Sequence, residues 1–137
     1  MTDFFIASLE DLSGLLDFRP SEMLGDSEVD LLMLCNLESI LTGMDWESVF
    51  DRVYINPVKE QGPEGPWIYK VSEGLLDELK KLGPDAVKTA ASEWAETDEW
   101  TLRADPKEKI ASVLQGLIGL AKRAGTEGKS LFIWTDP

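Results

Sequence analysis

Both ends of the chain carry short runs that are almost wholly apolar. Residues 3–7 read Asp-Phe-Phe-Ile-Ala, and residues 130–135 read Ser-Leu-Phe-Ile-Trp-Thr. A run of this length and character is typical of a strand that is covered on both faces. We therefore predict that the two terminal segments are strands, and that they pair with each other in one small sheet.

Between these runs, apolar residues recur three and four positions apart, which is the spacing of one face of an α-helix. The pattern predicts six helices, over residues 9–16, 27–42, 46–53, 73–82, 84–95 and 106–124. The helix over residues 27–42 has apolar residues on more than one face. We expect this helix to be central and largely buried.

Local signals predict where several of these helices begin and end. Asp45, Ser72 and Asp105 stand directly before helical segments, and their side chains are of the types that accept hydrogen bonds from the first free backbone N–H groups. Gly43 and Gly125 stand at the other ends. A left-handed backbone conformation is common at a helix stop and favours glycine.

Two β-prone runs, residues 53–58 and 67–71, flank a segment that contains two glycines and two prolines. This arrangement predicts a hairpin with a long loop over residues 59–66. The whole pattern predicts an α+β, helix-dominant fold, with about six helices packed on a small sheet that includes the N- and C-terminal strands. The length suits one unit, so we expect residues 1–137 to form a single acidic globular domain.

The charge of the chain indicates which kinds of partner it can bind. The chain has 26 acidic and 13 basic residues, and residues 1–43 contain nine acids against Arg19 alone, a net charge of -8. Such a surface repels nucleic-acid phosphates and anionic membranes and attracts basic proteins. We expect no nucleic-acid and no membrane partner, and a basic protein bound through Glu22, Asp26, Glu28 and Asp30. A role of the charge in solubility alone is the alternative.

Several chemistries lack the residues that they need. The chain has no histidine and one cysteine, Cys35, which lies in an apolar run. Ser-His-Asp catalysis, Cys-His catalysis and Cys/His zinc sites cannot be built from this chain. We expect no catalytic residue, no metal site, no cofactor and an unreactive Cys35. The single cysteine and the absence of a signal-peptide pattern or a long apolar segment favour a cytoplasmic protein.

Five tryptophans are many for a chain of this length. Trp46, Trp94 and Trp134 fall in apolar helical stripes or in the last strand, so we expect them in the core. Trp67 and Trp100 lie outside these stripes, and we expect both to be partly exposed. Exposed tryptophan is enriched at binding sites and forms cages for cationic ligands.

The densest group of carboxylates lies in residues 93–99. Glu93 and Glu96 are neighbours on a helix and offer oxygens that a hard cation such as Mg²⁺ binds, although such pairs are also common on solvated helix surfaces. With the exposed tryptophans, this group gives the candidate ligand-binding residues Trp67, Glu96, Glu99 and Trp100.

Three hypotheses of function remain. The favoured one is a non-catalytic, cytoplasmic protein-binding domain for a basic partner, in the manner of an immunity or inhibitor protein. The second is a small-ligand binding domain that uses tryptophan and carboxylates, and the third is a carboxylate- or metal-dependent enzyme. A pocket with converging acids favours the last two, whereas a flat acidic face favours the first.

Overall fold

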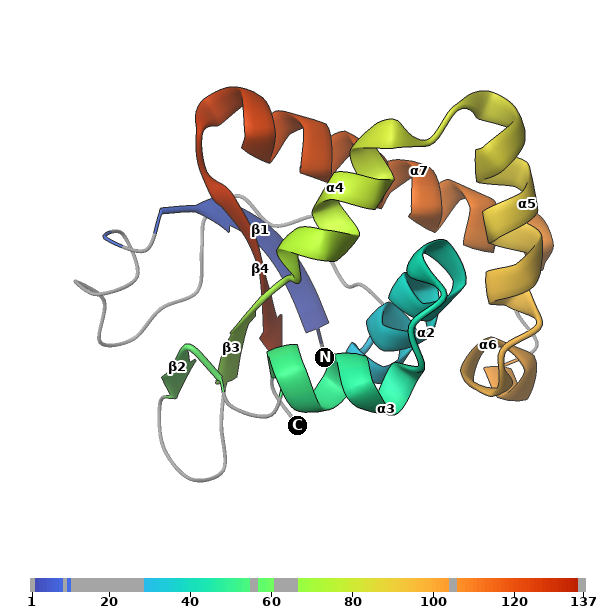
Figure 1. Cartoon of the computed structure of the whole chain (residues 1–137), viewed down its shortest axis with the longest axis horizontal. Coiled ribbons are helices and arrows are strands. Elements are labelled where there is room, and N and C mark those ends of the chain that lie inside the picture. Colours follow the sequence, from blue (N-terminus) through green and yellow to red (C-terminus); the bar gives the residue numbers. More distant parts are fainter. Residues whose placement is uncertain are drawn as a thin grey trace.

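The two ends of the chain meet in one antiparallel sheet (Figure 1). The computed structural model describes residues 2–8, 10, 29–54, 57–60, 67–103 and 106–135. The strands are β1 (Thr2–Ala7), β2 (Lys59–Glu60), β3 (Trp67–Lys70) and β4 (Ser130–Thr135), and they lie in the order β1-β4-β3-β2. Phe4 of β1 stands opposite Ile133 of β4. The predicted pairing of the terminal strands is confirmed.

Both faces of β4 are buried. Leu131 and Ile133 belong to the main core, while Phe132 and Trp134 belong to a second apolar cluster. These pairs alternate along the strand, and successive side chains of a strand point to opposite faces of its sheet. Phe5 of β1 stacks on Phe132 in the second cluster, with ring centroids 5.4 Å apart. The continuous apolar run at the C-terminal end is therefore explained by burial on both sides.

Six α-helices and one π-helical turn in the described residues pack beside this sheet. They are α2 (Leu31–Thr42), α3 (Trp46–Val49), the π-helical turn η1 (Phe50–Tyr54), α4 (Glu73–Lys81), α5 (Pro84–Ala95), α6 (Asp98–Arg103) and α7 (Lys107–Glu127). The fold is α+β and helix-dominant, as predicted. The helix expected over residues 9–16 lies, apart from Glu10, outside the described residues.

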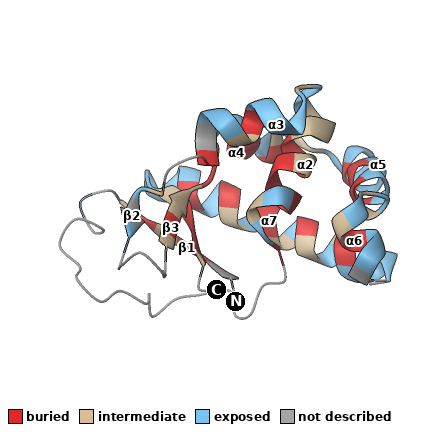
Figure 2. Cartoon of the chain, turned by 90° about the horizontal axis from the view of Figure 1, so that it is seen from below, coloured by how far each residue is buried: buried red, intermediate tan, exposed pale blue. Residues whose placement is uncertain are grey.

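Helix α2 is the centre of the helical layer. It contacts α3, α4, α5 and α6, and its residues Leu34, Cys35 and Leu37 are fully buried. Figure 2 shows α3 and α5 largely exposed, with buried positions gathered on α2 and the strands. In the described part of the chain, no helix combines the length and the apolar character needed to cross a bilayer.

Side-chain caps set several helix ends as predicted. Asp45 accepts hydrogen bonds from the N–H groups of Glu47 and Ser48, and Ser72 accepts one from the N–H of Leu75 at 3.4 Å. The Ser48 hydroxyl also donates to Asp45, which holds the pKa of Asp45 below its usual value. These bonds satisfy donors that have no partner within the helix.

The central helix begins later than predicted. We expected it to start at Ser27, but α2 starts at Leu31, because Asp30 has an extended backbone (φ -103°, ψ -178°) and its side chain accepts a hydrogen bond from the N–H of Met33 at 2.9 Å. The stop is as predicted, since Gly43 is left-handed with φ 79°.

The last helix differs from the prediction at both ends. It begins at Lys107, one residue after Pro106, and Asp105 lies outside the described residues. It continues through Gly125, which we expected to end it, and stops at Gly128, whose φ is 66°. A glycine inside a helix costs only about 1 kcal/mol, and packing of α7 against α4 and α5 outweighs that cost.

The hairpin has the predicted second strand, but its first strand, Lys59–Glu60, lies in the segment that was expected to be the loop. Residues 53–58 were expected to be extended, yet Val53 and Tyr54 belong to η1 and the strand is only Lys59–Glu60, paired with β3. The helical turn places Tyr54 in the core, where its hydroxyl accepts a hydrogen bond from the N–H of Ser72 at 3.1 Å. Burial of this one ring overrides the β propensity of the segment.

Candidate interaction surface

Trp100 does not lie where the sequence predicted. It is 1% exposed and packs edge-to-face on Trp94, with ring centroids 5.2 Å apart. We did not predict α6, and this short helix turns Trp100 inward against α5. A ring held in this way has no surface left for a ligand from solvent. The expectation of a partly exposed Trp100 is therefore wrong.

Trp46 is the opposite case. It was expected in the core and is 43% exposed. It is the first residue of a single-turn helix, and Val49, one turn later, takes the buried position. Trp94 and Trp134 are buried as predicted, and Trp67 at the start of β3 is half-buried.

Of the acidic residues predicted to bind a partner, Asp30 is exposed at the start of α2, where it also serves as the helix cap. Glu22, Asp26 and Glu28 lie outside the described residues. The structure therefore places one of the four.

The predicted carboxylates of residues 93–99 form an acidic corner where α5 gives way to α6. Glu93, Glu96 and Asp98 are exposed, while Glu99 is half-buried and accepts a hydrogen bond from the side-chain amide of Asn36 on α2 at 2.7 Å. Among the described residues, no three acidic or cysteine side chains come close enough together to hold a metal ion. The acidic corner thus consists of three exposed carboxylates and of Glu99, which is hydrogen-bonded to α2.

Residues 89–102 contain four acids and neither lysine nor arginine, and the nearest bases along the chain are Lys88 and Arg103. Elsewhere in the described residues, four basic side chains pair with carboxylates on their own or the adjoining element. The pairs are Lys70–Glu73 at 2.9 Å, Lys80–Asp77 at 3.6 Å, Lys81–Glu78 at 4.0 Å and Arg123–Glu127 at 2.8 Å. Unlike the acids of those pairs, Glu93, Glu96 and Asp98 have no lysine or arginine three or four residues away in the sequence, whereas Glu99 stands four residues before Arg103.

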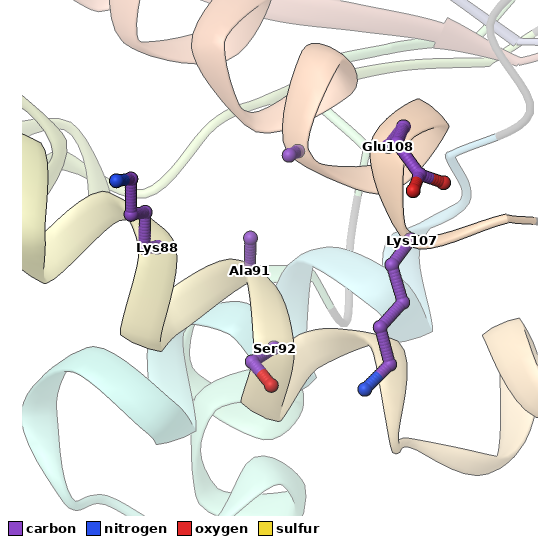
Figure 3. A pocket seen from close by; sticks show the side chains of 6 residues that line it. Lys88, Ala91, Ser92, Lys107 and Glu108 are labelled. Carbon is purple, nitrogen blue, oxygen red and sulfur yellow. The ribbon is translucent and has the colours of Figure 1, made fainter.

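A shallow hollow of about 250 Å³ lies between α5 and the start of α7 (Figure 3). It is lined by Lys88, Ala91, Ser92, Lys107, Glu108 and Ala111. Figure 3 shows the two lysine side chains pointing away from each other. The polar groups of this hollow do not converge on one point, as a specific ligand site requires.

A second hollow of about 400 Å³ lies between η1, β3 and the start of α4. It is lined by Arg52, Val58, Lys70, Val71, Ser72, Glu73 and Gly74. Lys70 is paired with Glu73 across its rim. Neither hollow brings together the predicted ligand residues Trp67, Glu96 and Glu99.

The sequence analysis did not predict a group of polar side chains that are buried in and beside α2. Glu38 of α2 is 5% exposed, and no described residue donates a hydrogen bond to its Oε1. Burial, followed by the nearby charges of Glu38 and Asp30, raises the pKa of Cys35 to about 12. Burial and the Glu38 charge also raise the pKa of Tyr54, against the lowering effect of its bond from Ser72. The burial of Glu38 could have been predicted, because Glu38 stands within a helix that was expected to be buried on more than one face.

The raised pKa of Cys35 predicts slow thiol chemistry in the folded protein. The thiolate is the reactive form, and the raised pKa reduces the fraction of thiolate at neutral pH. Burial also keeps a reagent from reaching the sulfur. We expect Cys35 to react with a disulfide reagent at pH 8 at least ~10-fold more slowly in the folded protein than in denaturant. Equal rates in the two states would show that Cys35 is open to solvent.

The chain has no match among protein-family models, curated proteins or solved structures.

Proposed function

We propose that this chain is a non-catalytic, cytoplasmic protein-binding domain whose partner is a basic protein, in the manner of an immunity or inhibitor protein. The observation that carries the proposal is the acidic corner, where the exposed Glu93, Glu96 and Asp98 have no basic residue along residues 89–102. The excess of acids in residues 1–43 adds to the same sign of charge.

Physical reasons link this charge distribution to binding. A surface of one sign raises the rate at which a partner of the other sign arrives, and it orients the partner on arrival. The Lys–Glu and Arg–Glu pairs of α4 and α7 largely cancel within one helical turn and therefore steer little. The corner and the N-terminal third account for the field that a basic partner meets first.

Affinity isolation from the native host tests the proposal. The tagged chain is immobilised, bound proteins are eluted with a salt gradient, and each candidate is then purified and titrated against the chain alone. We expect a basic partner whose affinity falls as ionic strength rises, because salt screens charges beyond about 10 Å. A stoichiometric partner that is acidic, or whose binding is insensitive to salt, would refute the proposed function.

Changing the N-terminal acids to amides should slow association with that partner. Replacing Glu22, Asp26, Glu28 and Asp30 by their amides removes four negative charges, and Asn is as good a helix cap as Asp at position 30. We expect the association rate constant to fall several-fold, roughly 3- to 10-fold at low salt, with dissociation little changed. Stopped-flow or biosensor kinetics at two salt concentrations measures this effect.

A matched control has the same net charge but different positions. Its four amide changes are at Glu73, Asp77, Glu78 and Glu127, all of which are paired with a base in the structure. If the control slows association as much as the N-terminal set, only net charge matters. If neither set has an effect at low salt, the charge serves solubility.

A further inference from the structure

Exposed large apolar side chains occur on three helices that are in contact through α2. The described residues include four of them, and Leu32, Trp46 and Leu102 lie on α2, α3 and α6, respectively. Helix α2 contacts both α3 and α6, and Figure 2 shows these two helices on either side of it. We call the surface formed by Leu32, Trp46, Leu102 and the exposed acids of these helices the α2/α3/α6 face.

One hydrogen bond fixes how two of these side chains are placed. Asn36 of α2 donates to Glu99 of α6 at 2.7 Å. Leu32 is four residues before Asn36, and Leu102 is three residues after Glu99. Residues with these spacings lie on the same side of a helix. Leu32 therefore lies on the same side of α2 as Asn36, one turn before it. Leu102 lies on the same side of α6 as Glu99, one turn after it.

The degree of exposure is unusual for side chains of this size. Leu102 is 86% exposed, which leaves nearly all of its apolar surface in water. Single exposed apolar residues are common, but groups of them bordered by polar residues mark interaction sites. Tryptophan such as Trp46 is among the residues most enriched at the energetic centres of interfaces.

The charges that border these side chains define the partner. Glu96 and Asp98 are exposed beside α6, and Glu47 and Asp51 are exposed on α3 and η1. The basic residues of α2, α3, η1 and α6 are Arg52, whose guanidinium donates to the sulfur of Met44, and Arg103, the last residue of α6. An apolar centre with an acidic border fits a segment with apolar side chains on one side and lysine or arginine on its edges.

From this arrangement we infer that the α2/α3/α6 face is the docking surface for a basic amphipathic helix of the partner protein. The inference rests on the proposed function and locates its binding site. The apolar side of the helix covers Leu32 and Leu102, its basic residues meet the surrounding carboxylates, and one cation lies on the ring of Trp46.

A synthetic peptide serves as the probe. It has about 18 residues of leucine and lysine arranged with the period of an amphipathic helix. A scrambled peptide of the same composition and a leucine/glutamate helix are the controls. We expect the leucine/lysine helix to shift the amide signals of α2, α3 and α6 and the indole signal of Trp46 in ¹⁵N NMR spectra, with Trp46→Phe assigning that indole.

Variants of the chain test the location. Leu102→Ser should weaken binding of the peptide by about 5- to 10-fold, and its high exposure leaves the fold intact. The matched control is Val58→Ser, since Val58 is 47% exposed and precedes β2, outside α2, α3 and α6. We expect the control to change affinity less than about twofold.

The charges are tested in the same way. Glu96→Gln with Asp98→Asn should slow association several-fold, whereas Asp85→Asn with Glu108→Gln, at the start of α5 and α7, should not. Shifts centred on other elements, equal binding of the scrambled peptide, or equal effects of Leu102→Ser and Val58→Ser would overturn the inference.

The physiological partner separates this inference from the proposed function. A basic partner that binds the Leu102→Ser chain as tightly as the unchanged chain refutes the docking surface and leaves the proposed function standing. An acidic or salt-insensitive partner refutes the proposed function itself.

Discussion

Replacing Trp94 by alanine is expected to lower the free energy of unfolding by about 3–5 kcal/mol, the usual cost of removing a large buried aromatic side chain. Trp94 is fully buried, and its indole N–H donates to the carbonyl oxygen of Met33 at 2.9 Å. Its ring also supports Trp100 through the edge-to-face contact. One side chain thus joins α5, α2 and α6.

Two further variants make this prediction testable even if the alanine variant does not fold. Trp94→Phe keeps an aromatic ring but loses the indole donor and part of the volume, so we expect a smaller cost of about 1–3 kcal/mol. Trp46→Ala is the matched control, because Trp46 is 43% exposed, and should cost less than about 1 kcal/mol. Urea denaturation measures all three, and equal costs at positions 94 and 46 would contradict the assigned burial.

Much of the fold follows from local rules that act within a few residues. Asp45, Ser72 and Gly43 define helix ends by hydrogen bonds or a left-handed backbone at the position itself. The terminal strands could be predicted to pair because each is too apolar for either face to meet water. In both cases the cause lies within the segment that shows the pattern.

The errors arise where a segment's conformation depends on what it packs against. Tyr54 is β-prone in sequence, but its hydroxyl bonds to the backbone of Ser72, eighteen residues away, and the chain stays helical to reach it. Gly125 is a good stop signal in isolation, yet α7 continues past it along α4 and α5. Neither contact is visible in a window of local sequence.

The candidate surface could likewise be predicted only where it depends on local sequence. The acidic corner could be found from sequence, since charges in a solvated helical segment need no partner. Exposure of single tryptophans could not, because α6 turns Trp100 inward and α3 is too short to bury Trp46. The apolar residue that contributes most to the proposed docking surface, Leu102, lies on a helix that the sequence pattern did not reveal.

Glu38→Met is expected to stabilise the fold, by about 1–3 kcal/mol. The Glu38 side chain is 5% exposed within the core helix α2, and no described residue donates to its Oε1. A buried carboxyl oxygen without a donor, such as Oε1, costs free energy because it gives up hydrogen bonds to water. Methionine has a similar length and fills irregular space well, so it removes this cost without opening a large cavity.

The thiol of Cys35 gives an independent readout of the same substitution. The charge of Glu38 is one cause of the raised pKa of Cys35, after burial. Its removal should lower that pKa and speed the reaction of the folded protein with a disulfide reagent. Glu38→Gln removes the charge at the same size but still buries polar atoms. We therefore expect it to stabilise the fold less than Glu38→Met does and to lower the pKa of Cys35 equally.

The control for stability is Glu93→Met, at an exposed position on α5, where a change within about 0.5 kcal/mol is expected. The three variants are compared by urea denaturation at one pH. A loss of stability in Glu38→Met of more than about 1 kcal/mol would mean that the carboxylate of Glu38 stabilises the native fold. The view that Glu38 lowers the stability of the fold would then be wrong.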